Sequence, residues 1–236
     1  MEWIARSEKG LVRPNNEDNL LTFPEIGLFA VADGMGGHQA GEVASRLAIE
    51  CLKITLSQGI RTDPLPQLMT AAGEANRVVY AAAQENKEYG GMGTTLTACV
   101  IQAQSLYWVH IGDSRGYLIR NDEITQFTRD HSLVSTYVRQ GKLTPEEAES
   151  HPYRNVLSRA LGTEPATSMD SGSVNVFTGD RIVLCTDGLT NHLAAEDILN
   201  LLRQGGLEEQ AGALIDLALE RGGKDNVTLI LISITD

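Results

Sequence analysis

The chain has 236 residues, of which 42% are hydrophobic, and since nothing in it resembles a linker we predict one domain over residues 1–236. Its net charge of −12 argues against nucleic acid as the main partner, because a phosphate polymer would be repelled over most of the surface. We find no signal peptide and no window of about 20 apolar residues, so we expect a cytoplasmic protein that does not span a membrane.

The first third of the chain is predicted to form strands and then two helices. Residues 3–7 and 19–32 read as strands interrupted by turn residues. Apolar residues recur at helical spacing over residues 43–54 and again over residues 68–82. Asp63-Pro64 marks the start of the second helix, as an N-cap residue followed by proline at the first helical position. We expect both helices to cover a sheet.

The middle of the chain changes to a strand pattern over residues 94–101, 106–111, 116–120 and 124–127. Asn121-Asp122 lies between the last two strands as a tight-turn signal. Consecutive strands joined by turns this short must be antiparallel, because parallel neighbours need a crossover of about a dozen residues or more. The sequence therefore excludes a Rossmann-type sheet.

Residues 130–165, named the flap here, read as a small helical insertion between strands, and Thr144 to Glu147 forms a capping-box pattern within it. A strand follows over residues 181–186, and then come two helices over residues 194–203 and 207–221. Gly222-Gly223 ends the second helix before a last strand. Strand blocks separated by helix blocks predict an α+β fold, with two antiparallel sheets packed together and helices outside.

Four aspartates lie where apolar runs stop or begin. Asp33 and Asp187 end strands and precede glycine, Asp113 follows a strand, and Asp225 opens the last strand. In antiparallel sheets the end of one strand lies beside the start of its neighbour, so these carboxylates can share one edge. Oxygen ligands without paired His or Cys favour Mg²⁺ or Mn²⁺, and the Gly34 carbonyl could complete the set. The alternative for each Asp-Gly pair taken alone is an ordinary turn.

The motifs in this order resemble the metal-dependent Ser/Thr protein phosphatases of type 2C, the PPM family, in their compact bacterial form. The resemblance covers nearly the whole chain. It implies a β-sandwich flanked by helices on both sides and a centre of two Mn²⁺ or Mg²⁺ ions. It also implies hydrolysis of phosphoserine and phosphothreonine by a water that bridges the two ions. The matching motifs are Arg13-Pro14-Asn15-Asn16-Glu17-Asp18-Asn19, Val31-Ala32-Asp33-Gly34-Met35-Gly36-Gly37-His38, Gly93-Thr94-Thr95, His110-Ile111-Gly112-Asp113-Ser114-Arg115, Leu184-Cys185-Thr186-Asp187-Gly188-Leu189 and Lys224-Asp225-Asn226-Val227-Thr228.

The resemblance also implies separate roles for the acids. Asp33 is similar to the carboxylate that bridges both metals, with Gly34 as the carbonyl ligand, and Asp187 and Asp225 resemble the remaining second-metal ligands. Asp18 resembles the acid that holds metal-bound water, and Glu17 is a second candidate for that role. In the bacterial pattern Asp113 and Asp187 would bind a third, weaker ion near the flap.

Two further residues are candidates for the reaction itself. Arg13 is our candidate for binding the substrate phosphate, because a planar guanidinium can bind two phosphate oxygens at once. The alternative is a solvated surface arginine. His38 is a candidate general acid. Some family members carry a histidine directly after the Asp-Gly pair, whereas Met35 stands there in this chain, so a metal-bound water is the alternative for protonating the leaving alkoxide.

The remaining histidines, tryptophans and cysteines are expected to be structural. His110 lies in a strand and should be a core or hydrogen-bonded residue, whereas His131 is expected to be exposed in a polar segment. Trp3 and Trp108 lie in apolar runs and are predicted core residues. The cysteines are odd in number, which is typical of reduced thiols.

The leading hypothesis is an active protein phosphatase whose substrates are phosphorylated proteins, targets of Ser/Thr kinases, and which works as a monomer. One alternative enzyme would hydrolyse small phosphomonoesters or act as a regulatory phosphatase of the anti-sigma type. The non-enzyme alternative is an acidic metal-binding signalling module whose output is the conformation of the flap.

Overall fold

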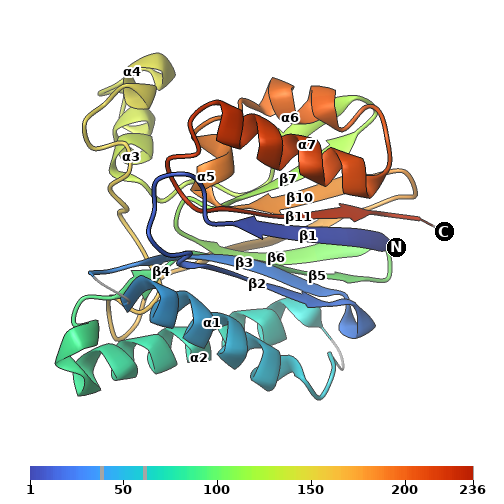
Figure 1. Cartoon of the computed structure of the whole chain (residues 1–236). Coiled ribbons are helices and arrows are strands. Elements are labelled where there is room, and N and C mark those ends of the chain that lie inside the picture. The colour runs from blue at the N-terminus through green and yellow to red at the C-terminus, as the bar shows by residue number, and fades with distance from the viewer. Residues whose placement is uncertain (38–39, 61–62, 236) are drawn as a thin grey trace.

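Two antiparallel sheets face each other, and helices cover the outer face of each sheet (Figure 1). The computed structural model describes residues 1–37, 40–60 and 63–235. Sheet A has the order β1-β11-β10-β7-β8 and contains β1 (Glu2–Glu8), β11 (Val227–Ser233), β10 (Arg181–Cys185), β7 (Arg115–Arg120) and β8 (Glu123–Gln126). Sheet B has the order β2-β3-β5-β6-β9 and contains β2 (Asp18–Phe23), β3 (Leu28–Met35), β5 (Leu96–Gln102), β6 (Ser105–Ile111) and β9 (Asp170–Asn175), with the short β4 (Gly93–Thr94) paired to β3.

The helices form two groups, one on each side of the sandwich, and a third group that stands apart. Helices α1 (Ala40–Leu56) and α2 (Pro64–Glu85) cover sheet B, and α5 (Asp187–Thr190), α6 (Ala195–Leu201) and α7 (Leu207–Glu220) cover sheet A. The flap carries α3 (Leu133–Arg139) and α4 (Pro145–Glu149), which project from one end of the sandwich (Figure 1). Two short 3₁₀ helices, η1 (Pro24–Ile26) and η2 (Lys87–Tyr89), complete the described elements.

Three buried clusters separate the four layers. The middle cluster lies between the two sheets and includes Phe29, Ile182 and Ile230, all with no exposed surface. The other two lie between sheet B and its helices and between sheet A and its helices. The predicted α+β fold, with two antiparallel sheets and helices outside, is therefore confirmed. No helix among the described residues is both long enough and apolar enough to cross a membrane.

Local signals in the sequence explain several element boundaries. The Asp63 carboxylate accepts a hydrogen bond from the backbone N–H of Leu65 at 3.2 Å, so this residue caps α2 as predicted. Thr144 and Glu147 form the expected capping box at the start of α4. Asn121 and Asp122 have φ values of 52° and 61°, the left-handed geometry of a two-residue hairpin turn between β7 and β8.

The structure differs from the sequence-based expectations in three places. The Asp33-Gly34 pair does not form a turn, because β3 continues to Met35 by pairing with β4, and Asp187-Gly188 opens helix α5. Trp3 is not a core residue: β1 is an edge strand of sheet A, and 38% of the Trp3 surface is exposed. Strand β9, which the sequence analysis missed, is an edge strand rich in serine and glycine whose exposure alternates.

Candidate active site

The carboxylates of Asp18 and Asp33 come from directly opposed positions on neighbouring antiparallel strands. Asp18 in β2 is the register partner of Asp33 in β3. The backbone of Asp33 is fixed by Thr95, which donates its N–H to the Asp33 carbonyl at 2.8 Å and accepts the Asp33 N–H on its hydroxyl at 2.9 Å. Like charges that face each other across a strand pair destabilise a sheet, so this pairing needs a compensating reason.

Two glycines allow backbone segments to approach closely at this edge. A Cβ atom on Gly188 would lie 1.9 Å from the carbonyl oxygen of Asn226, so only glycine lets the start of α5 pack on the start of β11. This contact places Asp187 close to Asp225. A Cβ atom on Gly34 would likewise lie 2.0 Å from the carbonyl oxygen of Gly41 in α1. The Asp-Gly pairs therefore reflect close packing and not turn formation.

The acids influence one another strongly. Burial raises the pKa of Asp33 well above its ordinary value, and the negative charges of Asp18, Asp187, Asp113 and Asp225 raise it further. Burial, together with Asp187 and Asp225, also raises the pKa of Asp18 to about 7. Asp187 shows the same direction of pKa shift for the same causes, with burial first and the charge of Asp225 next. The structure therefore brings together the acids that the sequence placed at strand ends.

The chemistry of these donors fits hard divalent cations. The Oδ1 atoms of Asp18 and Asp187 are buried and, among the described residues, have no hydrogen-bond partner. Such oxygens are strongly disfavoured unless a cation or a donor satisfies them. Every candidate ligand is an oxygen, as Mg²⁺ and Mn²⁺ prefer. No group of three or more acidic, His or Cys side chains within residues 1–37, 40–60 and 63–235 is already arranged to hold a metal ion.

Arg13 lies at the same edge, on the loop between β1 and β2. Its Nη2 atom donates to Oδ2 of Asp225 at 2.6 Å, and half of its side chain is exposed. The Asp225 bond is the first cause of the raised pKa of Arg13, and the charges of Asp33 and Glu17 contribute in the same direction. An exposed cation beside several acids can bind an incoming anion, so the placement agrees with the role expected for Arg13.

Asp113 lies in a cleft between the flap and the sandwich. The cleft has a volume of about 650 Å³ and is lined by Asp113 and Asp187 on one side and by flap residues including Val134 and Asn155 on the other. Burial, followed by the charge of Asp187, raises the pKa of Asp113 well above its ordinary value. The two acids named for a third ion therefore share one cleft.

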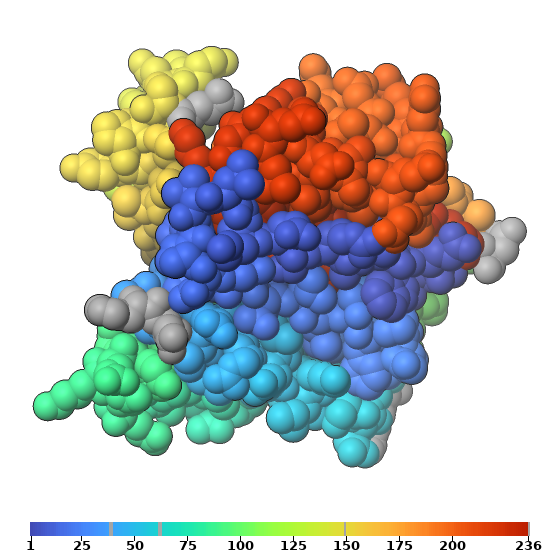
Figure 2. All heavy atoms as spheres, in the orientation of Figure 1, coloured from blue at the N-terminus to red at the C-terminus, as the bar shows by residue number. Residues whose placement is uncertain are grey.

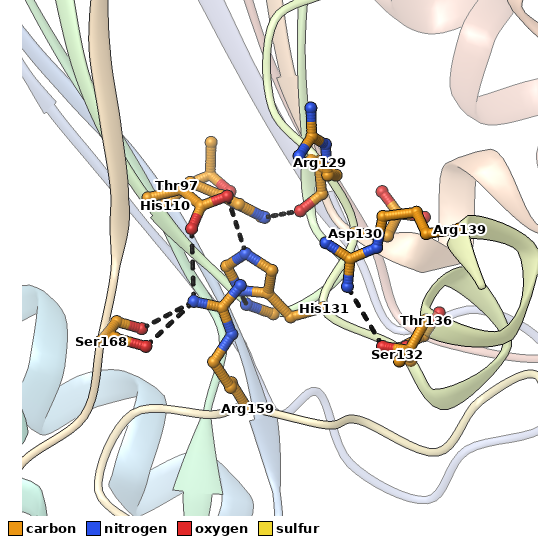
Figure 3. A network of polar contacts seen from close by, with 12 residues as sticks. Thr97, His110, Arg129, Asp130, His131, Ser132, Thr136, Arg139, Arg159 and Ser168 are labelled. Atoms are coloured by element: carbon orange, nitrogen blue, oxygen red, sulfur yellow. Dashed lines mark hydrogen bonds and ion pairs between the residues drawn. The ribbon is translucent and has the colours of Figure 1, made fainter.

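His131 corrects an expectation of the sequence analysis. It was predicted to be exposed, but it has no exposed surface, because its ring packs 4.8 Å from the ring of His110 (Figure 3). Its Nδ1 accepts the N–H of Gly112 at 3.2 Å, and its Nε2 lies 3.2 Å from Oδ2 of Asp170. His110 is buried and hydrogen-bonded, as predicted. His131 thus ties the root of the flap to the strand end before Asp113.

Three polar residues that support the acids were not singled out from the sequence for this work. Thr186 donates its hydroxyl to Oδ2 of Asp18 at 2.9 Å, and Asn191 donates its side-chain amide to Oδ2 of Asp187, also at 2.9 Å. The position of Asn191, four residues after Asp187, is a signal that could have revealed this pair. Thr95 gave no signal beyond the Gly93-Thr94-Thr95 motif. The candidate general acid His38 lies outside the described residues.

Known proteins resemble this chain throughout. Residues 14–209 match the family "Protein phosphatase 2C". The serine/threonine protein phosphatase PstP of Mycobacterium tuberculosis is 44% identical over 239 residues, which cover 100% of this chain and 45% of that protein. The serine/threonine phosphatase stp of Listeria innocua is 37% identical over 235 residues, covering 96% and 93%. This chain thus spans about half the length of the mycobacterial relatives that it matches.

The fold also agrees with solved structures. The catalytic domain of PstP in complex with two manganese ions superposes with a TM-score of 0.92 and 42% identity, and the match covers 100% of this chain and 98% of that chain. The likeness therefore extends over every layer of the sandwich and over the flap.

Proposed function

The chain belongs to the protein phosphatase 2C family, and we propose that it hydrolyses phosphoserine and phosphothreonine in proteins, with two Mn²⁺ or Mg²⁺ ions held among its aspartates. The observation that carries this proposal is the placement of Arg13 beside Asp225 at the edge where Asp18, Asp33 and Asp187 gather. An arginine bound to one of these acids offers an anion site next to an oxygen-rich cation site. A phosphate ester is the substrate that needs both.

Each residue has a defined task in this proposal. Asp33, the carbonyl of Gly34, Asp187 and Asp225 would hold the ions, and Asp18, with Glu17 beside it, would orient water. When bound, a pair of ions lowers the pKa of a water molecule and neutralises charge on the phosphoryl oxygens. The buried Oδ1 atoms of Asp18 and Asp187 support this assignment, because neither has a hydrogen-bond partner among the described residues and each can bind a cation or accept a hydrogen bond from water.

Arg13 would bind and orient the phosphate. Its bond to Asp225 uses a single nitrogen, Nη2, so the remaining N–H groups of the guanidinium are available to two oxygens of one phosphate. With the ester held in this way, His38 or a water would protonate the leaving alkoxide. Asp113 and Asp187 would hold a third, weaker ion in the cleft beneath the flap.

The wider setting is also proposed. The substrates would be proteins phosphorylated by Ser/Thr kinases, since the relatives are named serine/threonine protein phosphatases. We propose that residues 1–236 act as one phosphatase domain, a cytoplasmic monomer. A small-phosphomonoester or anti-sigma-type regulatory phosphatase, and a non-enzymatic metal-binding module, are the outcomes that the experiment below must exclude.

The experiment measures phosphate release from phosphothreonine and phosphotyrosine peptides and from a small phosphomonoester. Each assay is run with Mn²⁺, with Mg²⁺ and with a chelator, on the wild type and on Asp187→Ala. We expect release from phosphothreonine peptides that chelation or Asp187→Ala abolishes. A rate that survives chelation would refute the two-metal proposal. Turnover of the small ester alone would favour the small-substrate alternative, and no turnover together with partner binding that survives Asp33→Ala would favour the signalling module.

A further inference from the structure

Two exposed apolar side chains directly precede Arg13. Leu11 and Val12 are 68% and 67% exposed, although large aliphatic side chains elsewhere in the described chain are mostly buried in the three clusters. In Figure 2 the N-terminal segment, in blue, lies at the surface between the flap, in yellow, and the C-terminal helices, in red. One exposed apolar residue is unremarkable, but a neighbouring pair beside a phosphate-binding arginine borders the site itself.

Hydrogen bonds hold the backbone of this loop at the surface, and the Leu11 side chain lies over Gly223, with its Cγ atom 3.0 Å from where a Cβ atom on that glycine would be. The Leu11 N–H donates to the carbonyl of Gly223 at 2.7 Å, and the side-chain amide of Asn226 donates to the carbonyls of Lys9 and Asn15 at 2.8 and 2.9 Å. Gly10 has a φ of +76°, and a Cβ atom there would lie 2.1 Å from the carbonyl of Asp225. The backbone is thus pinned against the start of β11. Leu11 and Val12 cannot turn into the core without breaking these bonds.

We propose that Leu11 and Val12 form a contact edge for the polypeptide of the substrate and select aliphatic side chains next to the phosphorylated residue. The inference rests on the proposed function, because it takes Arg13 as the phosphate ligand. Successive residues of an extended peptide are about 3.3–3.6 Å apart, so a neighbour of a phosphoresidue bound at Arg13 is within reach of the adjacent loop. Burying aliphatic surface there favours binding.

The charges around the site support an apolar contact at this loop. The chain carries a net charge of −12, and the acids beside Arg13 disfavour acidic residues in a bound peptide. The cleft on the flap side is lined by polar side chains such as Arg154 and Asn155 together with apolar ones such as Val134. Leu11 and Val12 differ from these in their high exposure and in directly preceding Arg13, and this places them where an aliphatic neighbour of the phosphoresidue could be bound.

The test compares two phosphothreonine peptides of equal charge, one with leucine on both sides of the phosphothreonine and one with serine. We expect wild-type kcat/KM to be about tenfold higher for the leucine peptide, a difference in KM that corresponds to partial burial of two aliphatic side chains. The double variant Leu11→Ser with Val12→Ser should lose this preference. Ile54→Ser removes an aliphatic side chain that is 72% exposed on α1, outside the loop, and should keep it.

Several outcomes would overturn the inference. These are equal wild-type rates on the two peptides, or a preference that survives in the double variant and in Val12→Thr, which keeps the shape of valine and removes its apolar character. If the double variant instead dissociates an oligomer while the preference stays, the pair covers a second copy of the chain. Absence of turnover on both peptides in the wild type refutes the proposed function itself, so the two failures are distinguishable.

Discussion

Asn226 fixes the position of Arg13 without touching it. Its side-chain amide donates to the carbonyls of Lys9 and Asn15, which lie on either side of Arg13 in the loop between β1 and β2. Its Oδ1 accepts the N–H of Glu17 at 2.8 Å, and its own N–H donates to Oδ1 of Asp225 at 2.9 Å. One buried residue therefore sets the loop that carries Arg13 against the acid that Arg13 contacts.

Replacing Asn226 by aspartate should raise KM more than it lowers kcat. The change removes both donors and places a carboxylate against two carbonyl oxygens, a loss of about 1–3 kcal/mol, or roughly five- to 150-fold in KM. The measurement is steady-state turnover of a phosphothreonine peptide, with Asn86→Asp as the matched control. Asn86 caps η2 by accepting the Glu88 N–H, a role that a carboxylate also fills.

A double-mutant cycle separates positioning from general damage. If Asn226 acts through the guanidinium, Asn226→Asp should add little in an Arg13→Ala background, because residues in one network are not additive. Additive losses in KM would show that Asn226 serves the fold only.

Arg13→Ala should raise KM for phosphopeptides while leaving metal content normal. The guanidinium forms one charged hydrogen bond to Asp225, and alanine removes the other N–H donors, which would bind the phosphate. We therefore expect substrate binding to weaken by about 1.5–3 kcal/mol. Arg13→Lys should recover only part of it, because an ammonium lacks the planar fork. The measurements are peptide kinetics and bound Mn²⁺ by elemental analysis. Loss of metal in Arg13→Ala would make the residue structural.

Asp33→Asn should stabilise the metal-free protein while abolishing its activity. Asp33 is buried, faces Asp18 across the strand pair and lies among further acids, so an amide removes the cost of burying a charge and the repulsion of its neighbours, about 1–3 kcal/mol together. For a chain of this size the unfolding midpoint should rise by about 2–4 °C per kcal/mol.

The control for this variant is Asp180→Asn, which makes the same substitution at an aspartate that is paired with an arginine instead of facing other acids. The Asp180 carboxylate accepts from Arg120 at 2.6 and 2.8 Å, so Asp180→Asn should lower the midpoint. Thermal unfolding in chelator, and then with Mn²⁺, measures both effects. Mn²⁺ should stabilise the wild type and Asp180→Asn but not Asp33→Asn. A lower metal-free midpoint for Asp33→Asn would contradict the repulsion argument.

Helices α1, α2 and α7 and most strands could be predicted because their buried apolar residues recur at the spacing of a helix or a strand. Capping residues such as Asp63 mark where the helices begin. Strand β9 and helix α5 were missed because β9 is polar and α5 has four residues. Neither contains enough apolar periodicity to distinguish it from a loop.

Within the site, the acids could be predicted, but the long-range contacts of the residues that support them could not. Asp33 and Asp187 lie at the ends of apolar runs, a pattern visible in one stretch of sequence. The bonds of Asn226 to Lys9 and Asn15 join residues more than 200 positions apart, and the burial of His131 depends on its packing against His110. Such long-range contacts leave no local pattern, and polar residues in loops are exposed by default.

The stability of the wild type should fall more steeply with acid than that of His110→Gln. His110 is buried and neutral: its Nε2 donates to the Arg129 carbonyl at 3.0 Å, and its Nδ1 accepts from the Thr97 hydroxyl at 2.8 Å (Figure 3). Burial, followed by the nearby His131, lowers its pKa from 6.5 to about 4, although the charges of Asp130 and Asp170 act in the opposite direction.

Because the lowered pKa favours the neutral imidazole in the folded state, the unfolded state binds more protons between pH 6.5 and about pH 4. The contribution is therefore fully present above pH 6.5 and is lost as the pH falls, by at most about 3 kcal/mol. Urea unfolding of both proteins in chelator from pH 8 to pH 4 measures this loss. The buried aspartates titrate in both proteins, so the difference between the two curves isolates His110. This difference in unfolding free energy should be constant above pH 7, and below pH 6.5 its slope against pH should correspond to the uptake of up to one proton per molecule on unfolding. Parallel curves throughout would show that the pKa of His110 is the same in the folded and unfolded states.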